Sequence, residues 1–213
     1  MKGALLPLPG VGPSAPHTVA RLLDDRAHDA WITYEPAFLD APTADALLVE
    51  LARALPLSPE APVMFGRPIT VRRLTCGVGD AGRRYRYSGV ERVAHPWPAP
   101  VAALLDRLEA RTGARFTFAL CNFYPDGEVG LGWHADDEHD LAPDAPIASL
   151  SLGATRDFMV RPGRSGRATL TVPLDTGSLL VMGGALQRHY QHRVPQRLRC
   201  RDPRLNLTFR VMR

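Results

Sequence analysis

The stretch RLNLTFR, residues 204–210, decides the fold, because its polar and apolar side chains alternate without interruption. Successive side chains on a β-strand point to opposite faces, so Leu205, Leu207 and Phe209 share one face, which we expect to pack into a core. The opposite face carries Arg204, Asn206, Thr208 and Arg210. The stretch therefore predicts a strand that is apolar on one side and strongly polar on the other.

Other short strand-like runs fill the chain from residue 114 onward, and Gly, Pro and Asp residues separate them. The six runs that precede the last strand are ARFTFALCNFY (114–124), GLGWHAD (130–136), IASLSLG (147–153), DFMVRP (157–162), ATLTVPL (168–174) and GSLLVMG (177–183). The C-terminal half of the chain is therefore predicted to be all β.

Two amphipathic helices are predicted before these strands, over residues 40–55 and 98–113. Pro42 lies near the start of the first, and Gly113 ends the second. Seven short strands after two helices predict an α+β domain with a β-sandwich or barrel core. The segment between the helices, 63–89, is rich in arginine and glycine, so we expect hairpins and loops that are more exposed than buried.

The 213 residues are enough for one domain with a substantial core, and the charged fraction of 23% is ordinary for a globular protein. Because Pro and Gly interrupt its apolar run, we interpret 1–30 as a flexible leader and 31–213 as a single domain. No apolar run reaches the length of a membrane span. The three cysteines are widely spaced and predict no disulfide framework. We expect a cytoplasmic monomer.

The net charge is +4, and Lys2 is the only lysine, so 25 of the 26 basic residues are arginine. Arginine guanidinium groups suit phosphates and carboxylates, and the positive charge is compatible with a nucleic-acid partner. A genome rich in G and C would produce the same composition. Composition alone therefore identifies no partner.

The octapeptide WHADDEHD (133–140) suggests a metal site. On a strand, His134 and Asp136 project to the same side, so an imidazole and a carboxylate can bind one ion. The third ligand would be His189 or His192, and two histidines with one carboxylate form the facial triad of non-haem Fe(II) oxygenases. The alternative is a solvated acidic turn, which is the interpretation we favour for His139.

The polar face of the last strand would be costly to bury unless an anion meets its two arginines. A dicarboxylate fits, because each guanidinium group can bind one carboxylate. Asn122 and Tyr124 share one face of an earlier strand and could donate to the same ligand. The alternative is an arginine-rich strand face in solvent, with Asn122 and Tyr124 as ordinary polar residues at the edge of the core.

Several segments together resemble the AlkB-type Fe(II)/2-oxoglutarate dioxygenases, in particular the branch that repairs alkylated nucleic acids. The resemblance covers roughly residues 62–213 and rests on NFYPDG, WHADDEHDLAPDAPIASLSLGATRDF, GSLLVMGGALQRHYQHRVP and PRLNLTFR. It implies a double-stranded β-helix, or jelly roll, over about 114–213. A nucleotide-recognition lid over about 62–95 would cover it.

The resemblance also implies a role for each residue of the site. His134, Asp136 and His192 would bind Fe(II), which settles the choice of His192 over His189. Arg204 would bind the distal carboxylate of 2-oxoglutarate and Arg210 the carboxylate nearest the metal. Further hydrogen bonds would come from Asn122, Tyr124 and Asn206.

In the lid, RRYRYSG matches a family stretch whose aromatic residue stacks on an extruded base. Tyr87 is the first candidate for this stacking and Tyr85 the second. Asp137 and Glu138 would favour a cationic alkylated base, unless they belong to a solvated turn. Phe65 would be either an apolar wedge in duplex DNA or a core residue. The arginines expected to hold phosphates are Arg72, Arg73, Arg83, Arg84 and Arg86.

The activity that the resemblance implies is oxidative demethylation of N-alkylated bases in DNA or RNA. It would consume O₂ and 2-oxoglutarate and release formaldehyde, succinate and CO₂. One alternative is a 2-oxoglutarate oxygenase that acts on tRNA, protein or lipid. Another is a nucleic-acid-binding module with an inactive metal site.

Overall fold

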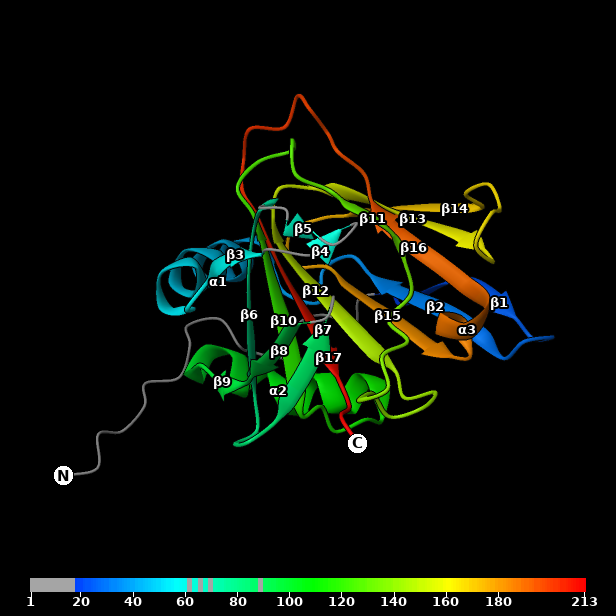
Figure 1. Ribbon diagram of the computed structural model, residues 1–213, viewed down its shortest axis with the longest axis horizontal. Helices are drawn as coiled ribbons and strands as arrows, with labels where there is room; N and C mark the ends of the chain where they lie inside the picture. Colours follow the sequence, from blue (N-terminus) through cyan, green and yellow to red (C-terminus); the bar gives the residue numbers. More distant parts are fainter. Residues whose placement is uncertain (1–17, 61–62, 65–66, 69–70, 88–89) are drawn as a thin grey trace.

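Two β-sheets face each other, and two helices cover the outside of the larger sheet (Figure 1). Figure 1 shows a computed structural model, and the structure describes residues 18–60, 63–64, 67–68, 71–87 and 90–213. Packed antiparallel sheets of this kind define a jelly roll. The predicted α+β fold with a jelly-roll core is therefore confirmed.

The larger sheet contains nine strands within the described residues, and only β9 joins it by parallel pairing there. Along the sheet the order is β1 (Ala20–Asp25), β2 (Ala30–Glu35), β15 (Leu179–Gly184), β12 (Ile147–Gly153), β17 (Arg204–Arg210), β10 (Phe118–Tyr124), β6 (Val71–Gly79) and β3 (Ser58–Glu60), with β9 (His95–Pro96) beside β6. The strand predicted to be polar on one face and apolar on the other is β17, and it thus lies at the centre of this sheet.

The smaller sheet has four strands, in the order β11 (Leu131–His134), β16 (Tyr190–Val194), β13 (Arg156–Pro162) and β14 (Leu170–Leu174). Two short ribbons lie apart from both sheets. They are β4 (Val63–Met64) with β5 (Arg67–Pro68), and β7 (Arg84–Tyr87) with β8 (Val90–Val93).

The two long helices are confirmed to within one residue at each end: α1 spans Ala41–Ala54 and α2 spans Ala99–Thr112. Asp40 caps α1 by accepting a hydrogen bond from the backbone N–H of Thr43 at 2.8 Å. Gly113 ends α2 in the left-handed conformation, with φ 69°. A third helix, α3 (Leu186–His189), is a single turn before β16. No helix in the described ranges is long and apolar enough to cross a membrane.

The alternating side chains of β17 place its apolar face in a core, as predicted. Leu205, Leu207 and Phe209 are fully buried in the core between the larger sheet and the two long helices. A second core, which includes Ile32 and Phe158, fills the space between the two sheets. The polar face of β17 therefore looks into the interior between the sheets, not into solvent.

Two expectations for the N-terminal part of the chain are corrected. Residues 20–25 of the predicted leader form β1, which pairs with β2, and β2 pairs in turn with β15. Residues 1–17 lie outside the described residues. The arginine- and glycine-rich segment contains β6, whose residues from Thr75 to Gly79 are all buried. A Cβ atom at Gly77 would lie only 2.7 Å from the ring of Phe118, so glycine marks close packing here and not a loop.

Candidate active site

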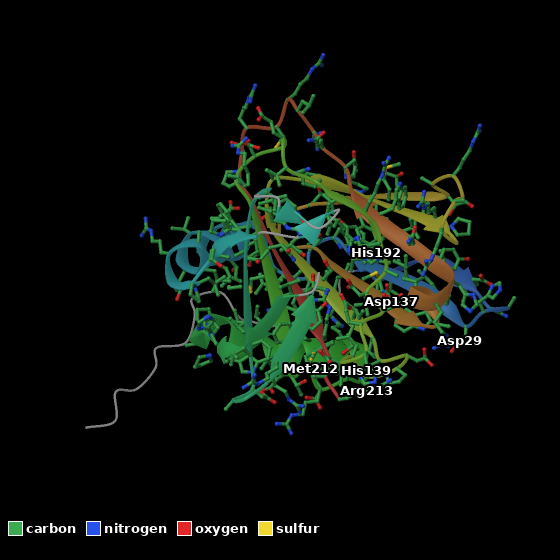
Figure 2. All side chains as sticks on the ribbon, in the orientation of Figure 1. Asp29, Asp137, His139, His192, Met212 and Arg213 are labelled. Carbon is green, nitrogen blue, oxygen red and sulfur yellow. The ribbon has the colours of Figure 1, made fainter. Side chains whose placement is uncertain are left out.

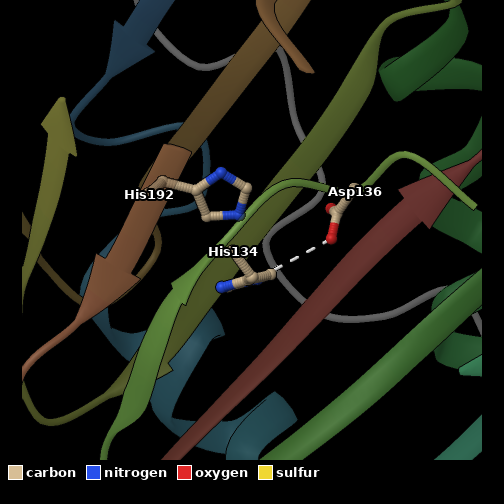
Figure 3. A group of neighbouring side chains, drawn as sticks. All are labelled: His134, Asp136 and His192. Atoms are coloured by element: carbon tan, nitrogen blue, oxygen red, sulfur yellow. Dashed lines mark ion pairs between the residues drawn. The ribbon is translucent and has the colours of Figure 1, made fainter. Parts of the chain in front are cut away.

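The two predicted histidines face each other across neighbouring strands. His134 ends β11 and is paired in register with His192 on β16, and their ring centroids are 4.2 Å apart. Asp136 follows two residues after β11. One ligand atom from each of the three residues lies within 4.8 Å of the others. Figure 3 shows the three side chains converging on one point. His189 instead packs against His28, with ring centroids 4.3 Å apart and the rings tilted by 38°.

Hydrogen bonds orient two members of this triad, His134 and Asp136. The Nδ1 atom of His134 lies 2.9 Å from the carbonyl oxygen of Gly132, which leaves Nε2 for a metal. Asp136 accepts from Arg210 at Oδ2 over 2.9 Å, and its backbone N–H donates to Oε1 of Gln187 at 2.9 Å. Its other oxygen, Oδ1, is buried and has no hydrogen-bond partner among the described residues.

The electrostatic state of the triad suits a divalent cation. Burial lowers the pKa of His192 to about 3, so its imidazole is neutral at pH 7. Burial acts to raise the pKa of Asp136, but the positive charge of Arg210 outweighs it and the pKa falls to about 2. Neutral imidazoles and an ionised carboxylate are the forms that bind a metal, and this donor set fits Fe(II).

The interior next to the triad contains a buried cation without an ion-pair partner in the described structure. Arg204 is 2% exposed, and Nη2 donates to Oγ of Ser151 at 3.0 Å. Its Nε and Nη1 atoms are buried without hydrogen-bond partners among the described residues. Burial lowers the pKa of Arg204 to about 10, and the ring of Tyr124 lies 5.3 Å away. Because such a group is costly alone, the site fits an anion such as a carboxylate of 2-oxoglutarate.

The remaining predicted cosubstrate residues line the same cavity, which also contains His134, Asp136 and His192. Asn122 lies opposite Asn206, and Tyr124 lies opposite Arg204, in the pairing of β10 with β17. The Asn206 amide is already engaged. It donates to Ser149 and Leu150 and accepts from Thr208. Direct contact of Asn122, Tyr124 or Asn206 with 2-oxoglutarate stays a prediction.

The aromatic residues predicted to contact a base are Tyr85, Tyr87 and Phe65, and the structure describes only the first of these side chains. Tyr85 is fully buried, 5.0 Å from Phe118 between ring centroids and 5.3 Å from the guanidinium of Arg210. The prediction that Tyr85 stacks on a base is wrong for this structure, because no ring face is exposed. Phe65 and the side chain of Tyr87 lie outside the described residues.

Asp137 and Glu138 line a cavity of about 200 Å³ that also reaches Asp136. Asp137 is exposed and Glu138 is half-buried. Burial and the charge of Asp136 raise the pKa of Glu138. His139, in contrast, has a side chain that is 90% exposed and lies near the C-terminal Arg213 in Figure 2, as expected for a solvated turn.

Two of the arginines expected to hold phosphates are ion-paired or buried in this structure. Arg72 pairs with Asp126 at 2.6 Å and with Glu128 at 2.9 Å, so its charge is neutralised. Arg73 is only 5% exposed. A third, Arg83, donates to the backbone carbonyl of Arg213. The prediction that Arg72 and Arg73 are free to bind phosphates is therefore corrected.

Three residues of the site were missed by sequence reasoning. Gln187 holds the backbone of Asp136, and Ser151 holds Arg204. Arg156 is 1% exposed and donates to three backbone carbonyls that lie before β11 and after β16. Only the clustering of polar residues near predicted ligands could have indicated them, since their roles depend on partners far away in the chain.

Comparison with known proteins identifies the class. A family model described as the 2OG-Fe(II) oxygenase superfamily matches residues 32–210. The chain is 39% identical to mouse alpha-ketoglutarate-dependent dioxygenase alkB homolog 3, across 83% of this chain and 64% of that relative. It is 41% identical to human DNA oxidative demethylase ALKBH2, across 69% of this chain and 59% of that relative. For the Arabidopsis thaliana DNA oxidative demethylase ALKBH2, the identity is 31% across 94% and 72%.

A solved structure, "The structure of OsALKBH1", shares the fold, with a TM-score of 0.61 at 20% identity over 84% of this chain and 96% of that one. The chain belongs to the 2OG-Fe(II) oxygenase superfamily, and its described residues include a group, His134, Asp136 and His192, that could hold a metal ion. Within that superfamily it belongs to the AlkB-type enzymes. The match spans about six tenths of the length of the mouse and human relatives.

Proposed function

We propose that this protein oxidatively demethylates N-alkylated bases in DNA. The observation that carries the proposal is the presence in one cavity of the three metal-ligating groups and the guanidinium of Arg204, whose Nε and Nη1 atoms have no hydrogen-bond partner among the described residues. The similarity to proteins named as DNA oxidative demethylases supports DNA as the substrate class.

In this proposal His134, Asp136 and His192 hold Fe(II). When bound with 2-oxoglutarate and O₂, the metal supplies the oxidising power that converts an N-methyl carbon to formaldehyde. Arg204 binds the far carboxylate of 2-oxoglutarate, and Arg210 holds Asp136 in place. The protein thus contributes ligand geometry and orientation, while the cofactor and cosubstrate supply the chemistry.

The alkylated base would lie near the cavity lined by Asp137 and Glu138. Alkylation at the pairing edge of a base can leave its ring cationic, and a nearby carboxylate stabilises a cation. Asp137 is exposed and is the carboxylate that can supply this charge. Glu138 is half-buried and its Oε2 atom has no hydrogen-bond partner among the described residues, so we assign that residue a hydrogen-bonding role.

The test is incubation of the purified protein with Fe(II), 2-oxoglutarate and oligonucleotides that each carry one N-methylated base. The product mass should fall by one methylene group, with one formaldehyde released for each base repaired. DNA, RNA and peptide substrates are compared in parallel, and His134→Ala is the inactive control. Turnover on peptides alone would overturn the proposal.

A further inference from the structure

A cluster of one tryptophan and two arginines lies on the outer face of the smaller sheet. Side chains alternate along these strands, so Trp133 and Arg193 point away from the interior that their neighbours His134 and His192 enter. The ring centroid of Trp133 lies 4.4 Å from the guanidinium carbon of Arg161 and 4.7 Å from that of Arg193. All three side chains are partly exposed.

Neither arginine has a carboxylate partner in the described part of the chain. Arg161 donates twice to Oε1 of Gln191, a neutral amide, with the shorter contact at 2.7 Å. Arg193 donates to Sδ of Met159 at 3.3 Å, and a sulfur atom is a weak acceptor. Two like charges thus converge on one indole ring, and no carboxylate among the described residues offsets their repulsion.

The surroundings add positive charge at the same end of the sheet. The connection between β13 and β14 begins two residues after Arg161 and carries Arg164 and Arg167, both exposed. One acidic residue, Asp157, shares the outer face of β13. It lies four residues from Arg161, or about 13 Å along the strand, opposite Pro173.

We propose that this cluster, Trp133 with Arg161 and Arg193, is a binding site for the sugar–phosphate backbone of a nucleic acid. The indole ring holds both guanidinium groups by cation–π contact, which limits their rotation and leaves N–H edges for phosphate oxygens. A partly exposed sheet face that carries two arginines, with two more in the adjoining connection, fits an extended polyanion better than a small ion. The inference rests on the proposed function, because it takes nucleic acid to be the substrate.

The test measures binding of unmodified oligonucleotides, single-stranded and duplex, by fluorescence anisotropy at several salt concentrations. The double variant Arg161→Gln/Arg193→Gln should bind roughly tenfold more weakly at low salt. The slope of log affinity against log salt should fall by about 1.4 for a single strand or about 1.8 for a duplex. The variant Arg161→Lys/Arg193→Lys keeps both charges and should retain most of that slope.

The matched control is Arg53→Gln/Arg115→Gln, which removes two exposed arginines outside the smaller sheet. If the cluster variant binds like this control, the inference is overturned. Uncoupled 2-oxoglutarate turnover and melting temperature should match the wild type in all variants, which shows that the fold and the metal site are intact. A wild-type protein that demethylates oligonucleotides while the cluster variant keeps full affinity would overturn this inference alone. Absence of any demethylation by the wild type would overturn the proposed function.

Discussion

Arg210 donates to Oδ2 of Asp136 across 2.9 Å, and the other carboxylate oxygen, Oδ1, faces Nε2 of His134 at 3.7 Å. One buried arginine therefore determines which oxygen atom is left for the metal. Arg210 was expected from the resemblance to contact the carboxylate of 2-oxoglutarate nearest the metal. That contact stays a prediction. In this structure Arg210 orients Asp136, a predicted metal ligand, and partners of this kind have large effects on metal affinity.

Replacing Asp136 with asparagine should abolish tight metal binding. The variant Asp136→Asn removes the one negative charge of the triad, and we expect Mn(II) affinity to fall more than about 100-fold, beyond the usual loss for an outer partner. Titration followed by electron paramagnetic resonance measures this. The control Asp137→Asn changes the adjacent exposed carboxylate and should keep wild-type affinity. Equal losses in both variants would contradict the assignment.

Replacing Arg204 should separate cosubstrate binding from folding. Because Arg204 is a buried cation without an ion pair within the described residues, Arg204→Met should melt at or above the wild-type temperature when no ligand is present. With Mn(II), 2-oxoglutarate at about 100 times its Kd should stabilise the wild type by about 2.7 kcal/mol, and the variant should gain little. A ligand-induced shift of wild-type size in the variant would remove Arg204 from the cosubstrate site.

The core face of β17 should dominate stability. Leu207 is fully buried, so Leu207→Ala should lower the free energy of unfolding by about 2–5 kcal/mol. Leu198 is 63% exposed, and Leu198→Ala should change it by less than about 0.5 kcal/mol. Urea denaturation of the metal-free protein measures both. A cost at Leu207 as small as at Leu198 would mean that β17 does not have this face in the core.

Acid should destabilise the metal-free protein. The pKa of His192 is about 3 in the folded chain and 6.5 in its ordinary state, so the unfolded chain binds more protons between these values. Its contribution to stability is complete above pH 6.5 and is lost as the pH falls toward 3. Asp136 acts in the same direction between pH 3.8 and about 2. Urea midpoints measured in EDTA should fall from pH 7 to pH 4, and less steeply in His192→Gln. A midpoint that rises on acidification would contradict this.

Much of the fold and the metal site could be predicted because each depends on local patterns. Alternation placed the two faces of β17 correctly, and Pro42 and Gly113 indicated the ends of helices that the structure confirms. His134 and Asp136 do converge, although β11 ends at His134 and hydrogen bonds from Gln187 and Arg210 hold Asp136 in place. The predicted convergence of His134 and Asp136 was therefore correct, but a shared strand face explains only part of it.

The rest depends on partners that are distant in sequence. β6 was missed because its glycines indicate turns locally, whereas here they allow Phe118 to approach closely. Arg72 and Tyr85 were misassigned for the same reason. Their partners, Asp126 for the arginine and Phe118 for the tyrosine, lie more than thirty residues away in the chain.

The hairpin of β1 and β2 covers one edge of β15. β2 pairs along all six residues of β15. A cut in the chain near residue 36 that released the hairpin would therefore expose the backbone N–H and C=O groups along one edge of β15. The first four residues of that strand are apolar: Leu179, Leu180, Val181 and Met182. An uncovered apolar strand edge is a template for aggregation. In the intact chain the hairpin covers this edge, so its removal should favour aggregation.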